Sequence, residues 1–193
     1  MIFATDALPA SSVVDSDSSV VAASKDLEVS LATNTPIRQL MPCLSNALLK
    51  TLTQKDGDTG WQESCTVLRI MNVAIDNSTR SDLTSVVGKI FNGLIAAYTV
   101  GGHVETTTTL LSNTNNCLIA LVMKLSETQL RSLYARLREW RGDIDSNESH
   151  SSRRYAFWSL SAELSKALKS IFFPCLTSVL SDVVDELVSV FIT

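Results

Sequence analysis

From Thr35 onward, apolar residues recur every three or four positions, which is the spacing of one face of an amphipathic α-helix. The pattern is clearest over Leu83–Ala97, Leu130–Trp140, Phe157–Ile171 and Leu176–Val190. Short polar breaks, several of them containing glycine or proline, separate these stretches. The pattern therefore predicts about six to seven helices joined by short links.

Capping residues indicate where several of these helices begin. Thr35 followed by Pro36 predicts a helix that runs to about Gln54 and is interrupted or kinked at Pro42. Ser126, with a glutamine three positions later, forms a capping box and predicts another helix start. Further helices are expected from Trp61 to about Asp76, after Ser81, over Leu110–Leu125, after the polar loop 142–152, and after Pro174. The β-branched runs at 85–88 and 188–193 leave strands open, although their spacing favours helix.

Residues 1–34 differ from the rest of the chain. The run Ser11–Ser19 is acidic, rich in serine and without periodicity. We expect 1–34 to be a disordered lead-in and 35–193 to be a helical domain. A period of roughly 40 residues for one helix pair fits stacked hairpins, which is an all-α, HEAT/armadillo-like α-solenoid. Because no clean repeat signature is visible, periodicity alone leaves a compact helical bundle as the alternative.

The overall charge conceals an uneven distribution. The 193 residues carry a formal charge of −4, which excludes a polycation of the histone-tail kind. Between Lys124 and Lys169, however, nine basic residues stand against six acidic ones. This sector predicts a candidate interaction surface for phosphates or an acidic partner, made of Lys124, Arg131, Arg136, Arg138, Arg153, Arg154, Lys166 and Lys169.

Ordinary solvated helix faces are the simpler interpretation of this basic sector. Arg131 and Arg138 share one flank of a helix, whereas Arg136 lies well round the cylinder, so the cations form no single stripe. Aromatic residues are not interleaved with them in the way that base stacking requires. We therefore expect that replacing Arg131, Arg138, Arg153 and Arg154 together lowers RNA affinity only slightly.

Candidate catalytic and metal-binding patterns are weak. Asp58-Thr59-Gly60 matches the triplet of aspartic proteases, but it lies in a polar turn between helices, where two carboxylates have no apolar β loops to share a proton. His103 and His150 have no metal-ligand spacing around them. The four cysteines are widely separated and are expected to be reduced. We predict no catalytic residue, no cofactor and no metal site, and we expect no membrane-spanning stretch and no signal peptide.

A three-part motif in the basic sector carries a family resemblance. Its parts are KLSETQLRSLYARLREW from Lys124, RRYAFW from Arg153 and LSKALKSIFFP from Leu164. The matching positions are Lys124, Leu125, Ser126, Glu127, Leu130, Arg131, Leu133, Tyr134, Leu137, Trp140, Arg154, Phe157, Trp158, Leu168, Lys169 and Phe172. In order and spacing the motif resembles the C-terminal domain of the large nucleolar HEAT-repeat protein of the small-subunit processome, a family associated with U3 small nucleolar RNA. Leu130 and Trp158 depart from the commoner phenylalanine and tyrosine.

The resemblance implies a non-enzymatic α-solenoid scaffold in the nucleolus that acts in pre-rRNA processing and rRNA transcription. It implies other processome proteins as partners, with pre-rRNA and U3 small nucleolar RNA in the same complex, and neither a membrane nor a small-molecule substrate. It also implies that the chain is part of a longer protein. The alternative is a cytoplasmic HEAT/armadillo adaptor that binds a peptide or helix in a groove, and localisation distinguishes the two.

Overall fold

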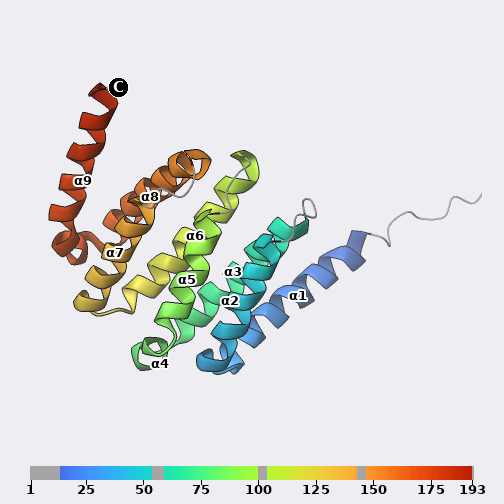
Figure 1. Ribbon diagram of the computed structural model, residues 1–193. Coiled ribbons are helices and arrows are strands. Elements are labelled where there is room, and N and C mark those ends of the chain that lie inside the picture. The colour runs from blue at the N-terminus through green and yellow to red at the C-terminus, as the bar shows by residue number, and fades with distance from the viewer. Residues whose placement is uncertain (1–13, 54–58, 100–103, 143–146, 193) are drawn as a thin grey trace, which may run out of the picture.

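The computed structural model describes residues 14–53, 59–99, 104–142 and 147–192. Every regular element in these ranges is helical, which confirms the all-α fold class and leaves no strand at 85–88 or at the described part of 188–193 (Figure 1). The elements are α1 (Val14–Asn34), α2 (Ile37–Thr53), α3 (Thr59–Asn77), α4 (Arg80–Thr84), α5 (Val87–Thr99), α6 (Val104–Met123), α7 (Glu127–Gly142), α8 (Asn147–Leu168), the 3-10 helix η1 (Lys169–Phe172) and α9 (Phe173–Ile192).

The helices stack side by side in the order of the chain. The pairs α2/α3, α5/α6 and α7/α8 are hairpins whose two helices pack on each other. Between hairpins, α2 packs on α5, α3 on α6, and α6 on α8. Figure 1 shows the resulting elongated stack, with α1 at one end and α9 at the other. Because each hairpin contacts mainly its neighbours, the architecture is solenoid-like, as the sequence predicted.

The segment expected to be a disordered lead-in is partly helical. Residues 1–13 lie outside the described residues, but α1 occupies Val14–Asn34, so the expectation of disorder across 1–34 is wrong for this part. Helix α1 packs on α3, where Ala32 is buried and Glu28 pairs with Arg69 at 3.2 Å. The sequence of α1 has little amphipathic periodicity, so the helix is stabilised by its contact with α3.

Several helix boundaries differ from the expected ones. Helix α2 runs through Pro42 without a break, because the one hydrogen bond lost is offset by the burial of Leu40, Met41 and Leu44 around it. The helix expected after Ser81 is divided into α4 and α5. Helix α8 begins at Asn147, inside the segment predicted to be a polar loop.

The break expected at Pro174 lies earlier in the chain, at Leu168–Lys169. Lys169 has a φ of 49°, the left-handed conformation that ends a helix, and it is the first residue of η1. Pro174 is the second residue of α9, where a missing N–H costs nothing because the first turn has no intrahelical acceptor for it.

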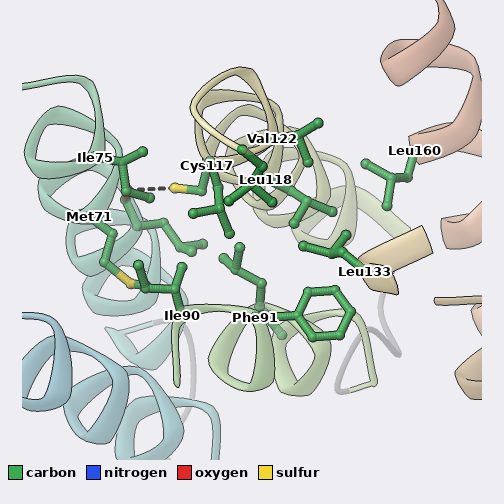
Figure 2. Close-up of a cluster of buried hydrophobic side chains, with 14 of the residues drawn as sticks. Met71, Ile75, Ile90, Phe91, Cys117, Leu118, Val122, Leu133 and Leu160 are labelled. Atoms are coloured by element: carbon green, nitrogen blue, oxygen red, sulfur yellow. Dashed lines mark hydrogen bonds between the residues drawn. The ribbon is translucent and has the colours of Figure 1, made fainter. Parts of the chain in front are cut away.

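One continuous apolar core runs through the stack from Ala32 to Cys175. Figure 2 shows its middle, where side chains from α3, α5 and α6 meet Leu133 and Leu160 from the next hairpin. Cys117 lies here, and its thiol donates a hydrogen bond to the carbonyl oxygen of Leu68 at 2.9 Å. Burial raises the pKa of Cys117 to about 12, so this thiol is a packing group and not a nucleophile.

Candidate interaction surface

The capping box predicted at Ser126 is present and begins α7. The backbone N–H of Gln129 donates to the Ser126 hydroxyl at 3.3 Å, and the backbone N–H of Ser126 donates to the Gln129 side-chain oxygen at 3.0 Å. Next to it, Glu127 pairs with Arg131 one turn later at 2.7 Å, an exposed pair of small energetic weight. The first part of the motif therefore fixes where α7 starts.

Three aromatic residues of the motif, Tyr134, Phe157 and Phe172, form a buried cluster, and the partly buried Trp158 packs at its edge. Tyr134 on α7 contacts Phe157 on α8, with ring centroids 5.8 Å apart, and meets Phe172 of η1 edge-on at 5.5 Å. Trp158 packs edge-on against Phe157 at 5.1 Å. The hydroxyls of Tyr134 and Ser161 lie 3.2 Å apart, and burial raises the pKa of Tyr134 to about 12. Leu125, Leu130, Leu133, Leu137 and Leu168 of the motif are also buried. These positions hold α7, α8 and η1 together.

Two arginines of α7 bind one buried carboxylate of α9. Arg138 donates from Nε to Oδ2 of Asp182 at 2.7 Å and from Nη2 to Oδ1 at 2.6 Å, the bidentate geometry of a strong ion pair. The Nη2 atom of Arg141 lies 3.5 Å from the same Oδ1 atom. The hydrogen bond to Asp182 raises the pKa of Arg138 further above its ordinary value. Helix α9 is thus held by charges that the basic sector supplies.

Arg141 also stacks against the aromatic cluster. Its guanidinium carbon lies 4.8 Å from the ring centroid of Phe157 and 5.5 Å from that of Trp158. Neither Arg141 nor Asp182 was among the residues predicted from sequence. The position of Asp182 among apolar residues on a predicted helix, in TSVLSDVV, was the available signal for a buried carboxylate that needs a cationic partner.

Two further members of the predicted surface make contacts within the chain. Arg154 on α8 forms an ion pair with Glu186 on α9, so a second carboxylate of α9 is bound. The Nζ atom of Lys124 donates to the backbone carbonyl oxygens of Asp76, at 2.9 Å, and Ser78, at 3.3 Å, at the C-terminal end of α3. A cation at a helix C-terminus satisfies carbonyl groups that have no intrahelical donor.

Of the other predicted cations, Arg136, Lys166 and Lys169 are exposed, whereas Arg153 is half-buried. Arg136 is exposed, stacks 4.6 Å from the ring centroid of Phe91 and donates to the Asn92 side-chain oxygen at 2.8 Å. Arg153 lies 5.9 Å from the ring centroid of Trp140. Lys166 pairs with Glu163 at 2.8 Å, and Lys169 is exposed in the turn after α8.

A shallow groove lies between α5 and α7 beside Arg136. It has a volume of about 540 Å³ and is lined by Phe91, Asn92, Ile95, Arg136, Glu139, Trp140 and Gly142. Trp140 is half-buried there, with its ring centroid 5.8 Å from that of Tyr98. The groove carries one cation and one anion on its walls, so its charge selects no particular class of ligand.

In the part of the chain that the structure describes, the candidate catalytic and metal-binding residues do not come together into a site. Asp58 and His103 lie outside the described residues, and Thr59 and Gly60 belong to the first turn of α3. His150 falls in the first turn of α8. No group of three histidine, cysteine or acidic side chains is close enough to hold a metal ion within 14–53, 59–99, 104–142 and 147–192. Over the same ranges, no helix is both long enough and apolar enough to span a bilayer.

Comparison of the chain with known protein families finds a match over the region that contains the motif. The family model of the BP28CT (NUC211) domain matches residues 78–191, from just before α4 to the end of α9, which is more than half of the chain. The chain belongs to the BP28CT (NUC211) domain family. This confirms the resemblance predicted from the motif, because BP28CT domains are non-catalytic helical domains of nuclear, nucleolar ribosome-biogenesis proteins. No curated protein and no solved structure matched the chain.

Proposed function

We propose that this BP28CT chain is a non-enzymatic scaffold module of the small-subunit processome, acting in pre-rRNA processing and rRNA transcription. The observation that carries the proposal is that the motif residues have a structural role. Tyr134, Phe157 and Phe172 pack against one another, and Arg138 binds a carboxylate of α9, so these side chains stabilise a rigid stack. A solenoid built in this way offers long outer surfaces to partner proteins.

The charge arrangement supports protein partners over direct RNA binding. Of the cations in the basic sector, Arg138, Arg141 and Arg154 neutralise carboxylates of α9, and Lys124 caps α3. Guanidinium groups already bound to carboxylates release few counterions when they meet phosphates. Other processome proteins are therefore the proposed direct partners, with pre-rRNA and U3 small nucleolar RNA present in the same assembly and the protein resident in the nucleolus.

Affinity purification of the tagged full-length protein tests this proposal. Small-subunit processome proteins and U3 small nucleolar RNA should be recovered, and imaging should show the protein in the nucleolus. Phe157→Ala, which removes a fully buried ring of the motif, should lower the recovery, whereas the nearby exposed change Tyr155→Ala should not. Recovery of no processome component with the unaltered protein would reject the proposal. A diffuse cytosolic signal would instead favour an adaptor that uses the groove between α5 and α7.

A further inference from the structure

Helix α9 is apolar on two opposite faces, of which the stack covers one. Its inner face carries Cys175, Val179 and Asp182, which pack against the core or bind Arg138. Its outer face carries a row of large apolar side chains that are between 49% and 71% exposed: Phe173, Leu180, Val184, Leu187 and Val188, here named the outer α9 stripe. In Figure 1, α9 ends the stack, and none of the described helices lies against its outer side. Helices that are apolar all round are normally covered on all sides.

The spacing within the outer α9 stripe is that of a helix–helix seam. Phe173, Leu180, Val184 and Leu187 are separated by seven, four and three residues, which places them along one side of the helix. With 3.6 residues per turn, this side lies roughly opposite Asp182 on the inner face. Such a row forms a ridge against which a second helix can pack.

The charges around the stripe are of one sign. From Ser170 to Thr193 the sequence contains no lysine and no arginine. Asp182 and Glu186 are bound by arginines of α7 and α8, whereas Asp185 is exposed beside the stripe. A partner that covers the stripe therefore gains from a cation at its rim and not from an anion.

The size of the stripe argues against a second copy of this chain as the occupant. From Phe173 to Val188 the helix rises about 22 Å, and with a width of about 10 Å the strip covers on the order of 200 Å². A stable interface between two proteins buries about 800 Å² on each side. Pairing two α9 helices would also bring like charges together. One helix, contributed by a partner that has other contacts, fits this area.

We propose that the outer α9 stripe is the docking site for an amphipathic helix of another protein, with an apolar face and with lysine or arginine at its rim. The inference deepens the proposed scaffold function and rests on it, since it gives the scaffold one defined contact. Two interactions select the partner: burial of the outer α9 stripe, and attraction between the basic rim of the partner helix and Asp185.

Two synthetic helical peptides test the proposal. Both have the same leucine stripe, one has lysines at its rim and the other has glutamates, and each is titrated into the purified full chain at physiological salt by NMR. The lysine peptide should bind at least about tenfold more tightly. Leu180→Ser combined with Leu187→Ser should weaken its binding about tenfold or more. The matched pair Leu27→Ser and Leu31→Ser, exposed leucines of α1, should leave binding unchanged.

A second matched pair of variants measures the contribution of the Asp185 charge. Asp185→Asn should reduce the preference for the lysine peptide severalfold, whereas Asp26→Asn, the same change on the exposed side of α1, should not. Circular dichroism establishes that the variants are folded, which is expected because each replaced side chain is exposed.

Three results would overturn the proposal. The first is equal affinity for both peptides, or binding that Leu180→Ser with Leu187→Ser leaves intact. The second is a dimer in sedimentation that this variant abolishes, since the stripe would then be a self-interface. The third is binding to phosphatidylcholine vesicles that the same variant abolishes. Failure of the scaffold function is separate, because it would appear as loss of processome components from the unaltered tagged protein while the peptide preference persists.

Discussion

Arg138 on α7 and Asp182 on α9 form a bidentate ion pair, with hydrogen bonds of 2.7 and 2.6 Å, across 44 residues of sequence. The Asp182 side chain is only 3% exposed, whereas that of Arg138 is 38% exposed. A carboxylate this deeply buried is costly without its partner. The pair therefore couples the position of α9 to the family motif on α7.

Removing Arg138 should destabilise the fold more than removing both partners. We expect Arg138→Met to lower the free energy of unfolding by about 2–4 kcal/mol, since Asp182 is left with only the longer contact to Arg141. The double change Arg138→Met with Asp182→Leu should recover most of this loss. Urea denaturation of the two single variants and the double variant measures the coupling, and strictly additive losses would mean that the pair is not coupled.

Phe157 should be among the most sensitive positions in the chain. Its side chain is fully buried and contacts Tyr134, Trp158 and Arg141. We expect Phe157→Ala to cost about 3–5 kcal/mol, whereas Tyr155→Ala on the exposed side of α8 should change stability by less than about 0.5 kcal/mol. Equal melting temperatures for the two variants would contradict the buried position of Phe157.

Helix faces and caps in this chain were predictable because they depend on neighbouring residues. Leu133 and Leu137 followed from spacing, and Ser126 followed from the glutamine three positions later. The partner of Arg138 was not predictable, because it lies 44 residues away and is reached only when α9 folds back onto α7. Helix α1 was missed for the same reason, since it depends on α3 for burial of Ala32 and for the pair between Glu28 and Arg69.

Stability should fall at alkaline pH. Burial raises the pKa of Cys117 from 9.0 to about 12 and that of Tyr134 from 10.0 to about 12. Well below pH 9 both groups are protonated whether the chain is folded or unfolded. At higher pH the unfolded chain releases these protons first, so the free energy of unfolding decreases progressively up to about pH 12.

Urea midpoints measured across this pH range provide the test. Cys117→Ala and Tyr134→Phe should each flatten the decline, and the two changes together should flatten it most. Cys43→Ala is the control, because that thiol is exposed. If the slope of stability against pH is the same in all variants, other groups are responsible for it.

The left-handed conformation of Lys169 should carry a cost that glycine relieves. A side chain at a φ of 49° is strained by about 1–2 kcal/mol, although glycine also loses more entropy on folding. We expect Lys169→Gly to raise the free energy of unfolding by up to about 1 kcal/mol. Lys166→Gly, within α8, should lower it by about 1 kcal/mol instead. A loss of stability with Lys169→Gly would mean that the lysine side chain stabilises the turn.

Direct RNA binding should be weak and should depend little on salt. Arg131→Gln, Arg136→Gln and Lys166→Gln change exposed cations without disturbing α9, unlike changes at Arg138 or Arg154. We expect this triple variant to lose less than about threefold in affinity for RNA, because each cation already has a partner in the chain. With single-stranded RNA, a dependence of log affinity on log salt steeper than about −2.1 for the unaltered chain would mean that three or more phosphates are neutralised.

The carboxylates of α9 occupy the places that phosphates would take on Arg138, Arg141 and Arg154. A chain truncated before Phe173 would lose three negative charges and no positive ones, so its net charge would change from −4 to −1. It would also uncover the guanidinium groups of Arg138, Arg141 and Arg154. Such a shortened protein would be expected to bind nucleic acid and to aggregate with it, and that behaviour would be a product of the cut rather than a property of the intact molecule.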